Sequence, residues 1–236
     1  MPFVQGEVIS HAQMSVEEGA HLQRGMNYQL ASGNSVFLMS VRKGAPYQDV
    51  VENDGRILIY EGHDAPRKRG DPDPKSVDQP EFYPGGSLTQ NGLFKEAAAR
   101  YNTDKTEFET IRVYEKIKPG IGVFNGAFAL RDCWQDKSQG RSVFKFRLEL
   151  LDDVRTSDAR TGGRRTQEPS PGRMIPPAIK LEVRARDDGQ CVECGSVDNL
   201  HFDHIIPYSK GGSSRLVRNV QLLCARHNLS KSDRII

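Results

Sequence analysis

The sequence has few cysteines and no long apolar run. Four of its 236 residues are cysteines, and three of them (Cys191, Cys194 and Cys224) lie in the last quarter of the chain. So few thiols cannot staple a chain of this length, which argues against a disulfide-built scaffold and favours metal binding in a reducing compartment. The apolar runs, such as Ile57–Tyr60, fall far short of the ~20 residues that a membrane helix needs. We therefore expect no membrane partner.

The start of the chain lacks a basic segment followed by an apolar core, so we expect no secretory signal and a cytoplasmic location. The net charge is also small, at +2, and it is unevenly distributed. Residues 1–152 carry 19 Lys+Arg against 21 Asp+Glu, whereas residues 153–236 carry 14 against 10. A modest basic excess in the last third is compatible with nucleic-acid binding, although by itself it is weak evidence.

The length suits two domains, since domains usually run ~100–150 residues. The composition changes over residues 153–177, which are rich in Gly, Pro, Ser and Arg and poor in large apolar side chains. Such a segment cannot bury enough surface to offset the entropy of ordering it, so we expect a flexible linker. The predicted domains are residues 1–152 and 178–236.

Patterns in the first domain predict an α+β fold. Ser15-Val-Glu-Glu18 has the spacing of a capping box and predicts a short helix running toward Tyr28. Apolar residues at helical spacing predict a second helix around residues 93–101, and residues 143–150 alternate as in a strand with one buried face. Further strands are expected at 35–41, 56–60 and 111–117. Many strands with few helices indicate a curved sheet or open barrel with helices packed outside it.

The second domain predicts a β-β-α unit that follows a leading helix. The helix is expected at residues 178–186, because Pro176-Pro177 is tolerated in a first helical turn and Asp187-Asp188-Gly189 is a good stop. Two short strands around 201–206 and 220–223 and a helix from Ala225 complete the unit.

Two matched pairs of metal-ligand residues lie in this second domain. Cys191-Val-Glu-Cys194 and Cys224-Ala-Arg-His227 each place two residues between their potential ligands. This spacing lets both members of a pair bind one ion, and three thiolates with one imidazole make a closed tetrahedral zinc site. Since a closed site has no open position for a substrate, the expected zinc is structural. Cys133 lies far away in the sequence and is most simply a small core residue.

The segment between and after these pairs resembles the HNH nuclease family, which has the ββα-metal fold. The string Asp203-His-Ile-Ile-Pro207, the later Asn219, and Cys224-x-x-His-Asn-x-x-Lys231 stand in the family's order. The resemblance covers about residues 178–236. It implies cleavage of phosphodiester bonds, which needs a base to deprotonate water and a divalent cation to take developing charge.

The same resemblance implies a role for each matching residue. His204 would be the general base, a task that suits an imidazole titrating near physiological pH. Asp203 and Asn228 would hold a catalytic Mg²⁺ or Mn²⁺ ion through oxygen ligands. Asn219 would pin the loop that carries His204, and Lys231 would contact phosphate. His201 is left out of the catalytic set, because a strand histidine more often makes local hydrogen bonds.

Residues 36–151 resemble the SRA (YDG) domain, a PUA-like fold that recognises modified cytosine. The resemblance begins with Gly44-Ala-Pro-Tyr47-Gln-Asp49 and Ile57-Leu-Ile-Tyr60-Glu-Gly62, and runs through Asn91-Gly-Leu-Phe to the last strand. It implies that a base is flipped out of the duplex and sandwiched by Tyr47 and Tyr60, with Asp49 accepting a hydrogen bond from the cytosine amino group. Phe124-Asn125-Gly126 stands where the family has Tyr-Asp-Gly, so the hydrogen bonding of that loop differs.

Together the two resemblances predict a modification-dependent, type IV restriction endonuclease for double-stranded DNA containing 5-methylcytosine or 5-hydroxymethylcytosine. Because one HNH site cuts one strand, double-strand cleavage implies a homodimer or two binding events. A nuclease placed by a flexible linker would cut at a variable distance from the modified base. Two alternatives stay open: an HNH nuclease of repair or mobile elements that ignores modification, and a modified-DNA reader without catalysis.

Overall fold

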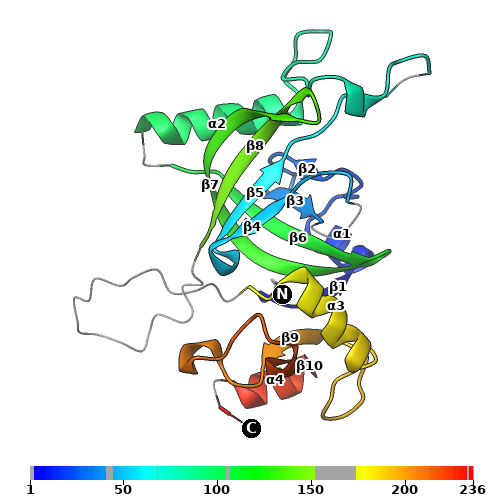
Figure 1. Ribbon diagram of the computed structural model, residues 1–236, viewed down its shortest axis with the longest axis vertical. Helices are drawn as coiled ribbons and strands as arrows, with labels where there is room; N and C mark the ends of the chain where they lie inside the picture. The colour runs from blue at the N-terminus through cyan, green and yellow to red at the C-terminus, as the bar shows by residue number, and fades with distance from the viewer. Residues whose placement is uncertain are drawn as a thin grey trace.

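The computed structural model describes residues 3–40, 45–67, 69–104, 107–151, 174–232 and 234–235. They form a sheet-rich N-terminal part and a smaller C-terminal part stacked along the long axis of the molecule (Figure 1). Most of the predicted linker lies outside the described residues. The predicted α+β class is confirmed, with helices flanking a strongly curved sheet. No helix in the described ranges has the length and apolar character of a membrane span.

An eight-stranded sheet forms the N-terminal part, in the order β2-β3-β6-β7-β8-β5-β4, with β1 pairing with β7 outside this path. The strands are β1 (Val8–Ser10), β2 (Met26–Asn27), β3 (Ser35–Met39), β4 (Val50–Glu52), β5 (Ile57–Glu61), β6 (Thr110–Lys118), β7 (Ile121–Ser138) and β8 (Arg141–Leu150). Only the β3–β6 pair among these is parallel. The length of β7 lets one strand pair with β1, β6 and β8, and it thereby connects the two ends of the sheet.

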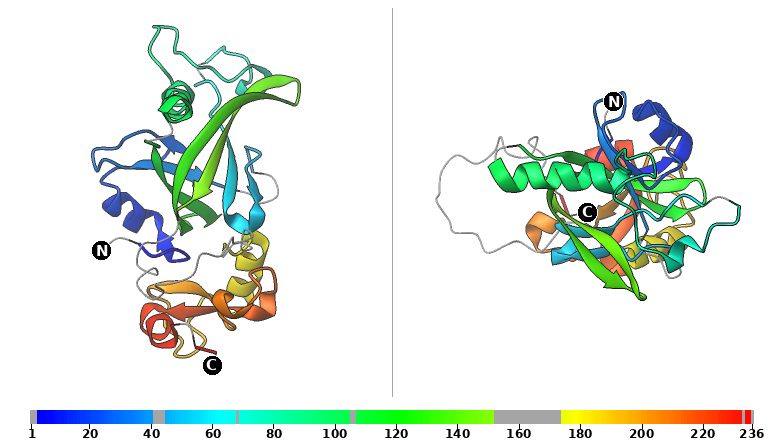
Figure 2. Two further views of the ribbon diagram at one scale, coloured as in Figure 1. Left: turned by 90° about the vertical axis from the view of Figure 1, so that its left-hand side faces the viewer. Right: turned by 90° about the horizontal axis from the view of Figure 1, so that it is seen from above.

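The core of the N-terminal part follows from the alternation of β8. Phe144, Phe146 and Leu148 are fully buried, as the pattern predicts. Helix α2 (Gln90–Asp104) covers this face of the sheet and packs Phe94 against Phe146 (Figures 1 and 2). Lys145 points the other way and is also buried, because its ammonium bonds to Glu61.

The first helix differs from the prediction. Helix α1 runs from His11 to Glu17, and its capping box is formed by Ser10 and Gln13 instead of Ser15 and Glu18. The backbone N–H of Ser10 donates to Gln13 Oε1 (2.8 Å), and the N–H of Gln13 donates to Ser10 Oγ (3.2 Å). Both sequences fit the motif, but the earlier start follows directly from β1 and buries Met14. No helix continues toward Tyr28.

The C-terminal part has the predicted β-β-α order. Helix α3 (Pro177–Arg186) precedes β9 (Leu200–His204), β10 (Val220–Cys224) and α4 (Ala225–Lys231). The two strands pair antiparallel, with His204 opposite Val220 and Leu200 opposite Cys224. This register places one cysteine at the start of α4.

The two parts are packed against each other. Val8 and Val123 of the N-terminal part share an apolar cluster with Val183 of α3 and Phe202 of β9. Helix α3 lies between the curved sheet and the β9–β10 pair (Figures 1 and 2). Met174, assigned to the linker from the sequence, is only 5% exposed and belongs to the core of the N-terminal part.

Two glycine substitutions test whether Met174 packs in the core of the N-terminal part. Gly55 and Gly86 both have positive φ, +91° and +83°, but an added Cβ at Gly55 would lie 2.0 Å from the Cβ of Met174, whereas one at Gly86 meets nothing. We expect Gly86→Ala to cost roughly 1–2 kcal/mol from backbone strain, and Gly55→Ala roughly 2–4 kcal/mol because overpacking is added. Chemical denaturation of both variants measures the difference; equal losses would contradict the packing of Met174.

Candidate functional sites

Four potential metal ligands converge in the C-terminal part. Cys191 and Cys194 lie in the tight loop after α3, Cys224 ends β10, and His227 lies in the first turn of α4. Their ligand atoms all lie within 4.8 Å of one another. Cys191 Sγ is 3.3 Å and Cys224 Sγ 3.5 Å from His227 Nδ1, and the sulfurs of Cys194 and Cys224 are 3.9 Å apart.

These separations fit a tetrahedral zinc ion. Bonds of about 2.3 Å to sulfur and about 2.0 Å to nitrogen imply sulfur–sulfur separations near 3.8 Å and sulfur–nitrogen separations near 3.5 Å. Burial raises the pKa of the Cys191 thiol, but hydrogen bonds from the backbone of Cys224 and from His227 outweigh it and lower the pKa to about 6. Cys191 is therefore largely a thiolate at neutral pH, the form that binds metal.

The predicted catalytic residues lie at the end of β9. Asp203 is half-buried, and its Oδ2 lies 2.9 Å from Lys231 Nζ of α4. Asn228 precedes Lys231 by three residues and so lies on the same face of that helix. Lys231 reaches β9 from α4, whereas a joint metal site of Asn228 and Asp203 stays a prediction.

Lys231 itself does not fit the predicted phosphate contact. It is 1% exposed, and its ammonium donates to the backbone carbonyl of His204 (2.7 Å) and pairs with Asp203. An ammonium buried with two partners has no surface to offer to a phosphate. Lys231 instead fastens α4 to the strand end that carries Asp203 and His204.

The side chain of His204 points into a loop that follows β9. Its Nε2 lies 2.9 Å from Ser214 Oγ, and its ring centroid is 6.1 Å from that of Tyr208. Ser214 is 4% exposed. Sequence reasoning missed this contact, since a serine in a Gly-Ser-rich loop has no spacing that marks it.

Asn219 closes the same loop from its far end. Its Oδ1 accepts from the N–H of Ile206 (2.9 Å), and its Nδ2 donates to the carbonyls of Ile206 (3.2 Å) and Ser213 (3.1 Å). Gly212 allows the close approach, because a Cβ there would lie 1.8 Å from the Ile206 carbonyl oxygen. Asn219 thus bonds both ends of the loop, whereas its part in orienting His204 for catalysis stays a prediction.

A second candidate site is a cavity of about 480 Å³ in the N-terminal part, whose lining includes Tyr47, Tyr60 and Glu115. Tyr60 is 1% exposed, packs in a tilted arrangement on Phe37 with ring centroids 4.3 Å apart, and donates its hydroxyl hydrogen to the Leu38 carbonyl (3.2 Å). Tyr60 is therefore a rigid wall. It shares this cavity with the half-buried Tyr47, and the stacking of a base between the two rings stays a prediction.

Tyr47 has neighbours on its ring in the structure. It stacks with His63 at 5.8 Å, and Lys75 Nζ lies 4.0 Å from its centroid. Tyr47 also borders a separate, more polar cavity of about 330 Å³ with His63, Asp64 and Asn91. Burial lowers the pKa of His63 to about 4, so this neighbour is a neutral ring at physiological pH.

Asp49 is not a lining residue of either cavity, but it is bonded to Ser40, which lines the larger one. Its carboxylate bridges two chain segments by accepting from the N–H of Ser40 (3.1 Å) and of Glu61 (3.0 Å). Burial raises its pKa to about 7, although these two backbone hydrogen bonds oppose the shift. In the structure its role is to bridge loops, and the base-edge contact stays a prediction.

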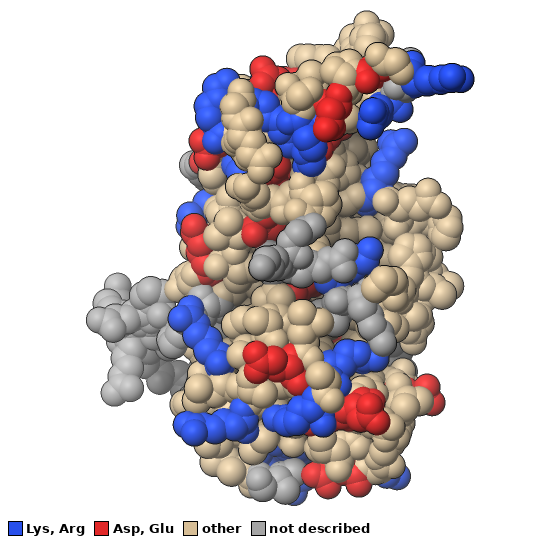
Figure 3. Space-filling view, turned by 45° about the vertical axis from the view of Figure 1, so that its right-hand side comes forward, with Lys and Arg blue, Asp and Glu red and all other residues tan. Residues whose placement is uncertain are grey.

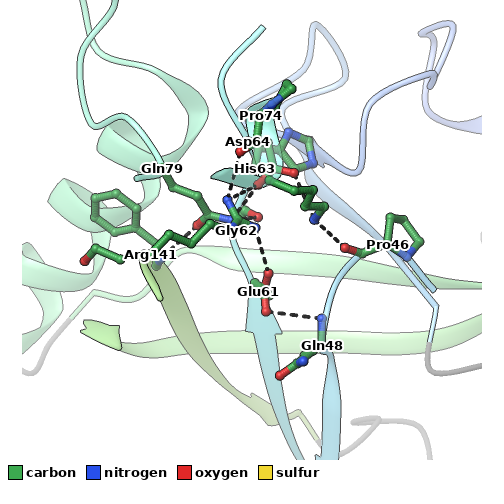
Figure 4. A network of polar contacts seen from close by, with 12 residues as sticks. Pro46, Gln48, Glu61, Gly62, His63, Asp64, Pro74, Gln79 and Arg141 are labelled. Atoms are coloured by element: carbon green, nitrogen blue, oxygen red, sulfur yellow. Dashed lines mark hydrogen bonds and ion pairs between the residues drawn. The ribbon is translucent and has the colours of Figure 1, made fainter. Parts of the chain in front are cut away.

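A polar network supports the segments on which Tyr47 and His63 lie (Figure 4). Arg141 bonds to Asp64 (2.6 Å) and pairs with Glu61 (3.5 Å), and Glu61 accepts from the N–H of Gln48 (3.2 Å). Gln79 donates to the Gly62 carbonyl (2.6 Å) and accepts from the backbone of β8. The network fixes the 46–48 and 62–64 segments to the sheet.

Comparison with protein-family models matches residues 191–234 to the HNH family, described as HNH endonuclease. These residues include both ligand pairs and the end of β9, and they form an HNH domain, as the resemblance predicts. Comparison with curated proteins gave no match.

Solved structures similar to this chain include the SUVH5 SRA domain. With hemi-methylated CG DNA it is 22% identical, with 65% of this chain and 92% of that one covered, at TM-score 0.44. The same domain with fully hydroxymethylated CG DNA is 20% identical, with 64% of this chain and 92% of that one covered, at TM-score 0.45. The type IV phosphorothioation-dependent restriction endonuclease ScoMcrA is 17% identical, with 99% of this chain and 56% of that one covered, at TM-score 0.43. SRA, the family that residues 36–151 resemble, is thus also the family of the first two structures.

Metal content tests the cysteine cluster. We expect one zinc ion per chain by elemental analysis, and a chelator should lower the thermal stability of the protein because binding energy is folding energy in such sites. Cys191→Ser should lose the zinc. Cys133→Ser is the matched control, because Cys133 lies outside the cluster, and it should retain the zinc. Retention by both variants would exclude the cluster as the ligand set.

The pinned loop is tested by Asn219→Ala. The change leaves the Ile206 amide and two carbonyls without partners, and one such buried group typically costs about 1–3 kcal/mol. Hydrogen exchange at residues 205–213 should accelerate while the zinc content stays that of the wild type. Unchanged exchange in this loop would mean that Asn219 does not hold it.

Proposed function

We propose that this protein is a modification-dependent DNA endonuclease of the type IV class, which binds duplex DNA containing 5-methylcytosine or 5-hydroxymethylcytosine. The observation that carries the proposal is the combination, in one chain, of an HNH domain with Asp203 and His204 at the end of β9 and a cavity bordered by Tyr47 and Tyr60. A nuclease alone has no use for a cavity bordered by two tyrosines, and a reader alone has no use for the HNH site.

Cleavage in this proposal depends on the end of β9. His204 takes the proton from the attacking water, and its contact with Ser214 together with the Asn219-pinned loop fixes the imidazole. Asp203 and Asn228 supply carboxylate and amide oxygens, the donor set that Mg²⁺ or Mn²⁺ prefers. A divalent ion held there would stabilise charge on the phosphoryl group and the leaving oxygen. Lys231 orients Asp203 by pairing with one of its oxygens.

Recognition in this proposal takes place in the 480 Å³ cavity. A 5-substituent is best read by enclosing the whole base, and extrusion costs a few kcal/mol that stacking must offset. Tyr60 offers a fixed ring, whereas Tyr47 lies on a loop segment and can turn toward a base once His63 and Lys75 release it. Asp49, predicted to accept from the cytosine amino group, would need to exchange a backbone partner for the base.

The distribution of Lys and Arg side chains on the surface supports binding to a polyanion such as DNA. Figure 3 shows Lys and Arg side chains in two regions of one face, at the top of the molecule and across the C-terminal part below, with acidic side chains interspersed. Phosphate contacts of this kind position a protein on DNA without reading its sequence. Since one HNH site cuts one strand, cleavage of both strands takes a homodimer or two binding events.

Plasmid cleavage tests the proposal, using unmodified DNA and matched DNAs carrying 5-methylcytosine or 5-hydroxymethylcytosine, with Mg²⁺ or Mn²⁺. Because ScoMcrA is phosphorothioation-dependent, phosphorothioated plasmid is a further substrate. We expect wild type to cut the cytosine-modified plasmids only and His204→Ala to cut none. Equal cutting of all plasmids would indicate a modification-independent nuclease, and binding without cutting would indicate a reader.

A matched pair at Tyr47 separates stacking from folding. Tyr47→Phe retains the ring and should retain discrimination between modified and plain duplexes. Tyr47→Ala should lose about 1–3 kcal/mol of binding to modified duplex, which is roughly a ten- to hundred-fold rise in Kd. Equal affinity of the two variants for modified duplex would remove Tyr47 from the proposed pocket.

A further inference from the structure

A buried charge cluster joins the HNH part to the N-terminal part. Lys180 Nζ of α3 donates to Glu115 Oε2 of β6 (2.8 Å) and to Asn125 Oδ1 of β7 (2.7 Å). Asn125 Nδ2 in turn donates to Glu115 Oε2 (2.9 Å). The three residues are 1–2% exposed, so the cluster is shielded from water. Asn125 is the middle residue of the triplet that departs from Tyr-Asp-Gly.

Such a cluster specifies one relative position of the two parts. Removing one member of a buried ion pair leaves an uncompensated charge, which typically costs about 3–5 kcal/mol. Glu115 Oε1 has no hydrogen-bond partner within the described ranges, so Lys180 is the cation that balances this carboxylate. A shift of α3 by even a few ångströms would separate Lys180 from both partners.

Backbone contacts fix the other side of the same interface. The N–H of Phe202 on β9 donates to the carbonyl of Gly6 (3.2 Å), and Glu7 and His201 form an antiparallel bridge. His204 follows His201 by three residues on the same strand, a distance of about 10 Å at ~3.3 Å per residue. The strand that carries Asp203 and His204 is therefore bonded to the N-terminal part at residues 201 and 202.

The cluster also contacts the proposed base site, since Glu115 lies in the wall of the cavity that Tyr47 and Tyr60 border. Glu115 thus belongs both to the lining of the cavity and, through its buried carboxylate, to the contact that seats α3. Binding site and nuclease strand are connected through packed, hydrogen-bonded residues, independently of residues 153–173.

From these contacts we propose that the docked HNH part, held by Lys180, sets a fixed distance between the modified base and the cleaved phosphodiester. The inference rests on the proposed function, and it replaces the variable distance expected from a flexible linker. Lys180 acts as a positioning residue: it touches neither the base nor the scissile phosphate, and it determines where His204 lies relative to the cavity.

The test maps cut positions by sequencing the ends produced from duplexes with a single 5-methylcytosine. Three proteins are compared with wild type: Lys180→Met, the control Glu182→Gln on the exposed side of α3, and a variant with about ten Gly/Ser residues added within 153–173, which would extend the reach of a tether. We expect narrow, identical windows for wild type, Glu182→Gln and the insertion, and a broadened window for Lys180→Met. A window that widens with the insertion, or one that Lys180→Met leaves narrow, would overturn the proposal.

Hydrogen exchange tests the docking of the two parts directly. It requires neither nuclease activity nor a folded Lys180→Met variant. In wild-type protein and in the insertion variant, the Phe202 amide and the amides of α3 should exchange equally slowly, because docking does not depend on the tether. Faster exchange at Phe202 in the insertion variant would overturn the docking itself. Absence of modification-dependent cleavage with protected Phe202 would instead overturn the proposed function and leave the docking intact.

Discussion

Three lysines that the protein buries almost completely, Lys145, Lys180 and Lys231, are each bonded to a carboxylate. A buried ammonium without a partner is too costly to persist, so the partner and the geometry around it become fixed together. In this chain each pair joins a functional segment to the scaffold. Lys145 holds Glu61 and the Gln48 carbonyl beside Tyr47, Lys180 seats α3, and Lys231 holds the end of β9.

These ion pairs could not be predicted from the sequence, whereas features set by local spacing could. The zinc cluster was predictable, because its ligands come in two pairs of fixed spacing and the geometry follows from the metal. The alternation of β8 was predictable for the same kind of local reason. Lys180 and Glu115 lie 65 residues apart, and no spacing rule connects a lysine on one helix to a glutamate on a distant strand. Tertiary packing alone decides such pairs.

The errors have the same physical origin. Lys231 resembles a surface phosphate ligand when only its helix is considered, and it becomes a buried positioning residue once β9 lies beside it. Ser15 and Ser10 both satisfy the capping motif, and the choice between them depends on β1 pairing with β7, which local sequence does not contain. Asp49 is not such an error: two backbone amides donate to its oxygens, and its contact with a base stays a prediction.

The HNH site depends on contacts between residues close in the sequence and on contacts between residues far apart in it. A zinc ion held by the cluster would fix Cys224 and His227 and so orient the start of α4, while Lys231 bonds the end of that helix to His204 and Asp203. Asn228 lies on α4 between these two anchors. On the side of the loop that follows β9, Ser214 contacts the His204 ring and Asn219 bonds to the Ile206 amide. The strand between these groups is bonded to residues 6–7 of the N-terminal part. The geometry of the site therefore depends on the packing between the two parts as well as on residues 191–234.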